Sequence, residues 1–570
     1  MKVFTTFSLL LTCRLATAWR SHRGCLCTSD QSCWPNASEF SQLQTQVSQP
    51  LVYPSPTASA CYPTSDPSGN CTEVIEQRTN GTWRSSMPGS MEAPNLETFV
   101  FKNGTIDACY PNTTITGTCG QGRVPVIGVD ARSVADIQAG VKFAVKHHLK
   151  LVIKNTGHDY LGRSAARGSF VVWTHNMKNI TFNPTFVAQG APENETYDAV
   201  TLGAGVQWGE AYAAVNQSRR TIVGGSAASI GAAGGWLAGG GHSALSPTYG
   251  LGVDNAIEIS VVLSTGEHLT VNNYQNPDLF WALRGGGGST YGIVTSVTYR
   301  TYPPVPAQKY LFRANVTNSS AMQELVGELL RSQPQFTDDG WGGYGSMNNH
   351  TLFFFYAAPN MTRETANATT QAFTNYARSL EPYGITSTAM LLSVPSWYDF
   401  FEEVFATVAS GGANTMVTSR LLSRGTVATE YAAIAEVLIS CGAVFGTVAG
   451  GKVNQIDPDS AGLNPSWRNA VVETLCKITW EDGASSTEIQ RMVDEFKEVI
   501  AVMHALTPLD GSYFGEASLF EIDWKKTFFG SHYSTLKSIK DKYDPLNIFV
   551  VAEGVGSEDW NKELTCRSRT

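Results

Sequence analysis

The sequence predicts an α+β protein with a ligand-binding domain and a second domain of mixed strands and helices. The chain is 570 residues long, 42% of it is hydrophobic, and segments with helical spacing alternate with short apolar runs typical of strands. This length exceeds that of one small module, and the apolar content excludes wholesale disorder. The 53 glycines indicate many tight turns or close approaches of the backbone to a ligand.

The first 18 residues have the layout of a secretory signal peptide. Lys2 precedes an apolar run, and Ala16-Thr17-Ala18 forms an A-x-A cleavage site, although Arg14 interrupts the end of the run. No later run reaches the roughly 18 uninterrupted apolar residues that a membrane span needs. The net charge of −9 argues against nucleic acid or an anionic membrane as a partner. We therefore expect a secreted, extracellular protein that acts as a monomer.

The cysteines and glycosylation sequons agree with export. Of 11 cysteines, Cys13 lies in the signal, and the other ten can form up to five disulfides whose pairing the sequence leaves open. Because no histidine cluster accompanies these cysteines, we expect no metal site. The chain also carries 13 N-x-[ST] sequons, a density that predicts N-glycans on the surface.

Residues 19–122 are rich in Ser, Thr, Pro and Cys and lack a sustained period, so we interpret them as a disulfide-linked, loop-rich arm. From Val124 onward the sequence shows regular apolar spacing, and we take 123–304 as the first domain. There, a strand at 124–128 and a second strand at 151–153 flank a helix that Ser133 and Asp136 start in the manner of a capping box. The pattern predicts a βαβ unit.

Further elements follow along the chain. The first domain has strands predicted at 169–173 and 199–202 and a hairpin formed by 257–263 and 267–271. The second domain, 305–510, has a strand predicted at 352–356 and helices at 321–332 and 488–504. Residues 511–570 form a C-terminal segment.

Five glycine clusters fall within 90 residues of the first domain, at 203–205, 224–226, 234–235, 239–241 and 285–288. Without a Cβ, the backbone N–H groups of such turns can approach phosphate oxygens. One cluster alone is most often a turn, but five together favour a phosphate-bearing ligand. The spacing is neither a Rossmann fingerprint, a Walker A loop nor a G-x-S-x-G elbow.

His158 lies where the strand at 151–153 gives way to a glycine-bearing turn, next to Asp159. Most histidines in such turns are simply polar residues, but a neutral imidazole there can also act as a nucleophile.

At these residues the chain resembles a known family. Residues 155–164 (NTGHDYLGRS) resemble the flavin-attachment loop of the fungal berberine-bridge-enzyme-like flavoproteins, in the vanillyl-alcohol-oxidase/PCMH superfamily. The resemblance continues, in the order of the family, at 231–243 (GAAGGWLAGGGHS), 246–254 (SPTYGLGVD), 276–288 (NPDLFWALRGGGG), 292–295 (GIVT) and 542–549 (KYDPLNIF). It covers 123–304 and about 510–560; the second domain matches loosely and the arm hardly at all.

The resemblance implies a PCMH-type FAD-binding domain of two α/β subdomains, an α+β substrate-binding cap, and a C-terminal segment that returns to the FAD domain. His158 would bond covalently to the flavin 8α-methyl group. The other residues that the resemblance places against FAD are Asn155, Thr156, Gly157, Asp159, Gly162, Gly225, Ser226, Ile230, Gly231, Gly235, Gly240, Gly241, His242, Ser243, Ile293, Val294 and Asn547.

Two positions depart from the family. Many relatives bond the flavin a second time through a cysteine, but Ala227 and Ala228 occupy that position here, so we predict attachment through His158 only. Members of the family commonly have Asn where this chain has Gly515, and this difference weakens any inference of the substrate from the family. Ile230 lies where relatives control oxygen access to the flavin, and its branched side chain leaves oxidase and dehydrogenase both open, with oxidase favoured.

The resemblance implies hydride transfer from an alcohol or amine carbon to flavin N5, while a base removes the hydroxyl or amine proton. Tyr513 and Glu516 are the candidate bases, although a tyrosine would need nearby positive charge to act as one. The partners would be a small-molecule substrate, possibly an oligosaccharide, and O₂ or another electron acceptor. The alternatives are a dehydrogenase that tailors a secondary metabolite, and a secreted glycoprotein that binds flavin without turnover.

Overall fold

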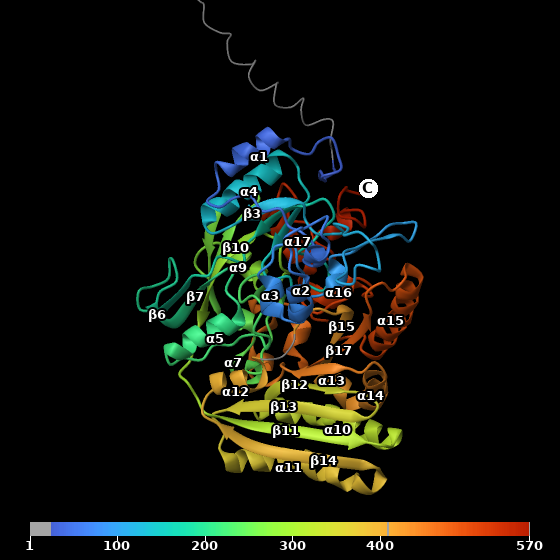
Figure 1. Ribbon diagram of the computed structural model, residues 1–570. Helices are drawn as coiled ribbons and strands as arrows, with labels where there is room; N and C mark the ends of the chain where they lie inside the picture. The colour runs from blue at the N-terminus through green and yellow to red at the C-terminus, as the bar shows by residue number, and fades with distance from the viewer. Residues whose placement is uncertain (1–23, 407–409, 569–570) are drawn as a thin grey trace, which may run out of the picture.

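The computed structural model describes residues 24–406 and 410–568 (Figure 1). The predicted signal peptide, 1–18, lies outside the described residues. Within those ranges, no helix combines the length and the apolar character needed to cross a bilayer.

The predicted βαβ unit forms a three-stranded parallel sheet. Helix α4 (Val134–Lys146) connects β3 (Ile127–Asp130) to β4 (Leu151–Lys154), and β5 (Phe170–Trp173) pairs between these two strands. The capping box is confirmed: Ser133 Oγ accepts from the N–H of Asp136, and the Asp136 carboxylate accepts from the N–H of Ser133 at 2.9 Å. The sheet directs the end of β4, and with it the loop that carries His158, toward the interior of the molecule.

A five-stranded antiparallel sheet follows, in the order β6-β7-β10-β8-β9. Its strands are β6 (Ile180–Phe186), β7 (Tyr197–Gly203), β8 (Ala256–Val262), β9 (His268–Val271) and β10 (Ile293–Arg300). The predicted hairpin is the β8–β9 pair. The helices between these strands are α5 (Trp208–Gln217), α6 (Gly235–Gly239), α7 (Ser246–Tyr249), α8 (Gly252–Asn255) and α9 (Pro277–Leu283).

The second domain is built on a seven-stranded sheet in the order β14-β11-β13-β12-β16-β17-β15, in which every neighbouring pair is antiparallel. Its strands are β11 (Ala307–Val316), β12 (Gly342–Met347), β13 (Thr351–Pro359), β14 (Ile385–Val394), β15 (Asn414–Ser423), β16 (Val444–Thr447) and β17 (Ala470–Trp480). Its helices are α10 (Ser319–Asp338), α11 (Arg363–Ser379), α12 (Trp397–Val404), α13 (Arg424–Thr429), α14 (Tyr431–Ser440) and α15 (Ser486–Leu506).

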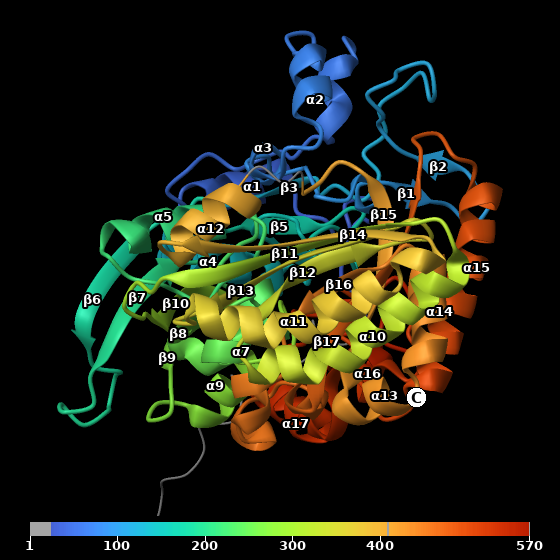
Figure 2. The ribbon, with the colours of Figure 1, turned by 90° about the horizontal axis from the view of Figure 1, so that it is seen from below.

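Helices α10, α11 and α14 lie along one face of this sheet (Figure 2). Leucine, phenylalanine and alanine side chains of the sheet and helices form a core between them that includes Leu329, Phe354 and Ile434. The predicted strand and helices of this domain are thus present as β13, α10 and α15.

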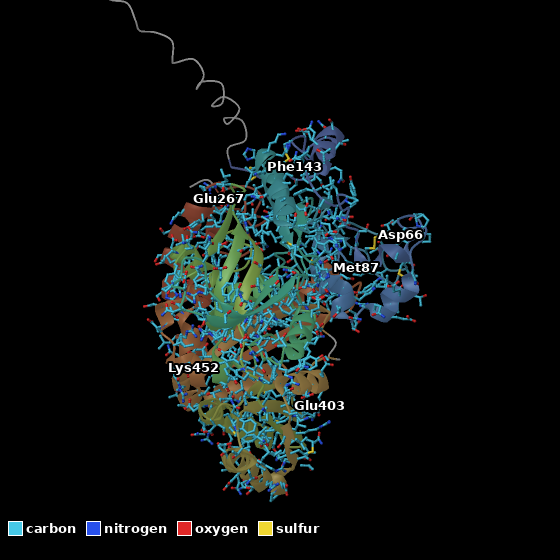
Figure 3. All side chains as sticks on the ribbon, turned by 90° about the vertical axis from the view of Figure 1, so that its left-hand side faces the viewer. Asp66, Met87, Phe143, Glu267, Glu403 and Lys452 are labelled. Carbon is cyan, nitrogen blue, oxygen red and sulfur yellow. A yellow bond between two sulfur atoms is a disulfide. The ribbon has the colours of Figure 1, made fainter. Side chains whose placement is uncertain are left out.

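The arm is more regular than predicted. It contains α1 (Ala37–Gln44), α2 (Cys71–Gln77) and α3 (Gly81–Ser85), besides the short pair β1 (Phe99–Val100) and β2 (Ile106–Asp107). Each helix begins after an asparagine whose side chain accepts a backbone N–H of the first turn. The part around α2 projects from the body of the molecule, with Asp66 in this projection and Met87 closer to the body (Figures 2 and 3).

The C-terminal segment carries α16 (Trp524–Phe529) and α17 (Tyr533–Tyr543), and α17 packs against α9. The buried Lys540 Nζ donates to the carbonyl oxygens of Thr290 (2.7 Å) and Phe549 (2.8 Å) and pairs with Asp544. Through this lysine the C-terminal segment is fixed to the glycine-rich turn before β10.

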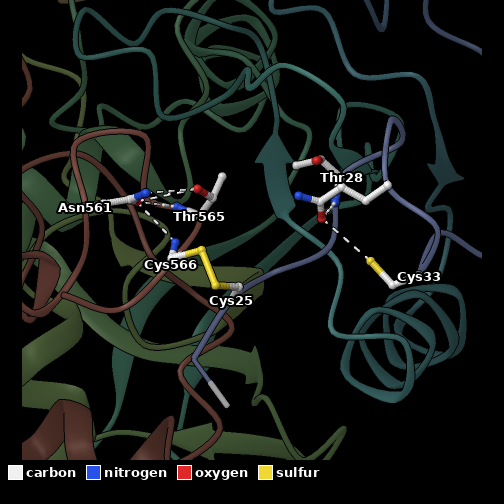
Figure 4. Close-up of a disulfide and its surroundings, with 7 residues drawn as sticks. Cys25, Thr28, Cys33, Asn561, Thr565 and Cys566 are labelled. Carbon is white, nitrogen blue, oxygen red and sulfur yellow. Dashed lines mark hydrogen bonds between the residues drawn. A yellow bond between two sulfur atoms is a disulfide. The ribbon is translucent and has the colours of Figure 1, made fainter. Parts of the chain in front are cut away.

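Five disulfides join the ten cysteines of the described residues: Cys25–Cys566, Cys27–Cys33, Cys61–Cys71, Cys109–Cys119 and Cys441–Cys476. The first links the two ends of the described chain, where Asn561 accepts from the N–H of Cys566 at 3.1 Å (Figure 4).

Candidate active site

A cavity of about 190 Å³ lies where the three-stranded sheet, the glycine-rich turns and the C-terminal segment meet. Thirteen of the predicted site residues line it: Asn155, Thr156, Gly157, His158, Asp159, Gly225, Ser226, Ile230, Gly231, Gly235, His242, Ile293 and Val294. The predicted bases Tyr513 and Glu516 also line it, as do Gly287, Gly288, Ser289 and Thr290 of the turn before β10. The sequence therefore predicted about half of the residues that line the cavity.

The remaining predicted residues lie outside this lining. Gly162, Gly240 and Gly241 adopt positive φ angles in the turns that shape the loops, and a Cβ at Gly241 would lie 2.8 Å from the Trp236 ring. Ser243 is buried and accepts from the N–H of Leu245. Asn547 is partly exposed in a left-handed turn. These five residues therefore do not line the cavity, and their contact with FAD stays a prediction.

The loop after β4 presents His158 to the cavity. Burial, followed by the charge of Lys154, lowers the pKa of His158 to about 3, so the imidazole is neutral at ordinary pH. Its Nε2 lies 2.8 Å from Ser229 Oγ, and its Nδ1 has no hydrogen-bond partner among the described residues. A neutral imidazole with one engaged and one free nitrogen is the nucleophilic form of histidine.

On another wall, His242 lies between two carboxylates. Its Nε2 is 3.6 Å from Glu473 Oε2 and 3.5 Å from Glu516 Oε1, and its Nδ1 is 3.0 Å from Tyr344 Oη. Burial opposes a charge on His242, but the two carboxylates outweigh it and raise the pKa. Burial and the charge of Glu516 also raise the pKa of Glu473, to about 8. The cluster is arranged to take up and hold one proton near neutral pH.

Tyr513 forms part of the same wall. It is buried, and its ring is 5.2 Å from the His242 ring, in an edge-on orientation. Burial and the carboxylates of Glu516 and Glu473 raise its pKa well above the usual value, and only Arg163 opposes them. A tyrosine that acts as a base needs positive charge nearby, but the charges nearest Tyr513 are mostly negative. Tyr513 therefore keeps its proton.

Comparison with known proteins places this geometry in a family. A model of an FAD-binding domain matches residues 125–272, and a model described as "Berberine and berberine like" matches 512–556. An uncharacterized FAD-linked oxidoreductase of Arthroderma benhamiae is 36% identical over 578 residues, which cover 95% of this chain and 96% of that protein. A VAO-type flavoprotein oxidase of Thermothelomyces thermophilus is 31% identical over 564 residues, which cover 97% of this chain and 96% of that protein.

The crystal structure of a VAO-type flavoprotein from Myceliophthora thermophila superposes with a TM-score of 0.86 and 30% identity, covering 95% of this chain and all of that one. The chain belongs to the berberine-bridge-enzyme-like, VAO-type family of FAD-linked oxidoreductases. The predicted family and α+β fold are confirmed, and the molecule is an FAD-dependent oxidoreductase that acts on a small molecule and passes electrons to an acceptor.

The cavity of this flavoprotein suits a cofactor that carries hydrogen-bond donors and acceptors. A Cβ at Gly234 or Gly235 would meet nothing within 4 Å, so the cavity is open at these glycines. The backbone N–H groups of Gly157, His158 and Gly234 donate to no acceptor among the described residues. The buried Asn155 Oδ1 also has no described partner. A flavin carbonyl or phosphate oxygen would accept from these N–H groups, and a ribityl hydroxyl or a flavin N–H would donate to Asn155 Oδ1.

Sequence reasoning missed two residues of the proton-holding cluster of this flavoprotein, Glu473 and Tyr344. Both come from the sheet of the second domain, on β17 and β12, and neither lies in a segment that resembles the family. One signal was present: Glu473 interrupts the apolar strand residues Val471 and Val472, and a charged residue in a buried strand is rare without a partner.

Proposed function

We propose that the protein is a secreted oxidoreductase with FAD attached covalently through His158 only. The observation that carries this proposal is a neutral, half-buried imidazole on the wall of the cavity with Nδ1 free. The ten cysteines of the described residues are all in disulfides, and none lines the cavity, so no thiol in this part of the chain can supply a second bond.

The proposed reaction is the oxidation of an alcohol or amine carbon. When bound, the flavin supplies a hydride acceptor at N5 and returns electrons to an acceptor. Glu516 lies on the cavity wall and takes the hydroxyl or amine proton of the substrate. His242 holds Glu516 in place and shares the proton, while the buried Glu473 behind it stabilises the positive imidazolium.

Tyr513 and Tyr344 have supporting roles in this proposal. Because both keep their protons, neither acts as the base. Tyr344 reaches His242 Nδ1 from the cap and fixes the orientation of the ring. The neutral Tyr513 ring forms a wall of the cavity against which the substrate carbon is held.

Oxygen is the proposed electron acceptor, with H₂O₂ as its product. The relative from Thermothelomyces thermophilus is named a flavoprotein oxidase, which supports this assignment. Ile230 lines the cavity and is half-buried, so it contacts the same space as the cofactor.

Export and glycosylation form part of the proposal. Five disulfides are typical of an oxidising compartment. Every acceptor asparagine of the 13 sequons is exposed except Asn216, which is half-buried. Glycans therefore have access to nearly all of these positions.

The test is acid precipitation of the purified protein, followed by anaerobic mixing with a panel of alcohols, sugars and amines. After acid precipitation, we expect the yellow colour to stay with the protein in the pellet. In the anaerobic mixtures, we expect at least one compound to reduce the flavin and so to lower its visible absorbance. A His158→Ala variant should keep the fold and release its flavin into the supernatant. Colour in the supernatant of the wild type would refute the covalent bond, and a flavin that no compound reduces would favour a binding protein.

A further inference from the structure

A segment of the N-terminal arm lies directly across the flavin-attachment loop. The N–H of Glu92 donates to the carbonyl oxygen of Gly157 at 3.0 Å, and Lys154 Nζ donates to the carbonyl oxygen of Met87 at 2.9 Å. Arg84 Nε donates in turn to the carbonyl oxygen of Met91 at 2.8 Å. The backbone that leads into Glu92 is therefore held at a fixed position next to the loop that carries His158.

The Glu92 side chain is buried at 5% exposure, and neither of its carboxylate oxygens has a hydrogen-bond partner among the described residues. Its Oε1 lies 3.7 Å from His158 Nε2. A Cβ at Gly411 would lie 2.2 Å from Oε2, so the chain leaves room for this carboxylate by placing a glycine there. Since an unsatisfied buried carboxylate is costly, its position calls for a function.

The orientation of the His158 ring relates this carboxylate to the attachment reaction. Nε2 faces Ser229 Oγ and the Glu92 carboxylate, which leaves Nδ1 to bond the 8α carbon. A neutral imidazole that forms a bond through Nδ1 becomes positively charged and must release the Nε2 proton. The nearest carboxylate to that proton in the described chain is Glu92.

We propose that Glu92 is a positioning residue for the covalent attachment of FAD, which orients His158 and accepts its Nε2 proton. This inference rests on the proposed attachment through His158. In the reaction, the Nδ1–C8α bond forms and one C–H bond of the 8α-methyl group breaks. The two electrons of that C–H bond remain in the flavin, which takes up two protons, one of them through Glu92. Molecular oxygen then takes the two electrons and two protons and becomes H₂O₂.

The charges around Glu92 fit this role. Burial raises its pKa to about 8, while Arg84 and Lys154 lower it and Glu97 raises it. Lys154 is itself buried, and its pKa is lowered to about 7. Tyr160, whose pKa is raised, also faces the carboxylate and stays neutral. A carboxylate with a raised pKa is a stronger base once ionised, so attachment should accelerate as the pH rises through about 8.

The experiment follows attachment itself rather than turnover. The full-length wild type and Glu92→Gln are produced in a host starved of riboflavin, then mixed with FAD from pH 6 to 9. The covalent fraction is read after acid precipitation and from the mass of the peptide that contains His158. We expect Glu92→Gln to bind FAD but attach it about 10²-fold more slowly, without the rise through pH 8. Glu92→Asp should keep the pH-dependent rise at a lower rate.

Ser410→Ala is the matched control, because Ser410 Oγ lies 2.9 Å from Ser229 Oγ in the same cluster but cannot accept the proton as a carboxylate does. It should attach FAD at a rate close to that of the wild type. Equal rates in Glu92→Gln and the wild type would overturn the proposal, as would a wild-type rate that is flat from pH 6 to 9, a result that does not depend on the variant folding. A wild type that never bonds FAD would instead refute the attachment at His158.

Discussion

Gly515 shows how one missing side chain shapes the active site. A Cβ at this position would lie 2.4 Å from Tyr513 Cζ and 2.6 Å from its hydroxyl oxygen. Gly239 also lies against this ring: a Cβ on Gly239 would lie 2.8 Å from Tyr513 Cε2. Tyr513 can therefore adopt this position only because both neighbours are glycines.

We expect Gly515→Ala to displace the Tyr513 ring and to lower kcat by about 10-fold to 10²-fold, because small misplacements in an active site are expensive in rate. Steady-state kinetics with a substrate found in the panel, together with the visible flavin spectrum, measures this. Gly425→Ala is the control, since a Cβ there meets only Ser423 Oγ at 3.9 Å. An unchanged kcat and spectrum in Gly515→Ala would show that the tyrosine does not need this space.

The cluster of His242, Glu473 and Glu516 predicts a particular pH dependence. The site must accept a proton, so kcat should rise with pH as the cluster loses its own proton, between the usual histidine value of about 6.5 and the value of about 8 for Glu473. In Glu473→Gln, the removal of the neighbouring negative charge lowers the pKa of His242, and the rise should move to lower pH.

The measurement is a pH profile of kcat for the wild type and Glu473→Gln, with and without a chelator. The chelator is included because the donor atoms of the three residues lie within 4.8 Å of one another and could also hold a metal ion. Overlapping profiles for the two proteins would exclude Glu473 from the proton-holding cluster. Loss of activity with the chelator would favour a metal instead.

At the scale of elements, helix α4 begins with a capping box whose carboxylate is buried. The Asp136 carboxylate is buried at 1% exposure and accepts from the N–H groups of Arg132, Ser133 and Ser48. Burial alone would raise its pKa, but these hydrogen bonds outweigh it and lower the pKa. One residue therefore fixes both the start of the helix and the arm segment that contains Ser48.

We expect Asp136→Ala to lower the free energy of unfolding by about 2–3 kcal/mol, because it leaves several buried donors unsatisfied. The control is Glu210→Ala at the equivalent position of the capping box of α5, where the side chain is exposed and about 0.5–1 kcal/mol is expected. Chemical denaturation monitored by tryptophan fluorescence compares the two. Equal losses of unfolding free energy in the two variants would show that burial of the cap adds nothing to stability.

The same elements show what a sequence can and cannot reveal. The start of α4 was predictable because Ser133 and Asp136 are three residues apart and interact locally. The arm helices were not predicted because they are only five to eight residues long and too short to show a sustained period, although α1 begins with a capping box of Asn36 and Glu39. The insertion of β5 between β3 and β4 depends on long-range pairing, which no local pattern encodes.

At the scale of the whole molecule, the Cys25–Cys566 disulfide joins residues separated by 541 positions. We expect the Cys25→Ser, Cys566→Ser double variant to lose about 2–5 kcal/mol of the free energy of unfolding, since the cross-link restricts the whole unfolded chain. Cys61→Ser, Cys71→Ser removes a bond of separation 10 within a small separate core and should cost less. Denaturation under non-reducing conditions measures both, and a larger loss for the second pair would contradict the expectation.

The residues of the active site were likewise predictable where they lie in one contiguous motif, and not where they come from distant parts of the chain. The attachment loop and glycine turns lie in contiguous motifs, so the sequence alone predicted about half of the residues that line the cavity, His158 among them. Glu473 and Tyr344 reach His242 only because the sheet order places β12, β16 and β17 side by side above the cavity. Glu92 reaches His158 through the arm, which the family motifs do not cover.

The most direct test of the central claim is mass spectrometry of the proteolytic peptide that contains His158, taken from protein purified in its folded, oxidised form. The account predicts that this peptide carries the mass of FAD less two hydrogens, and that every other peptide from the cavity wall is unmodified. An unmodified His158 peptide, or flavin on a different residue, would contradict it.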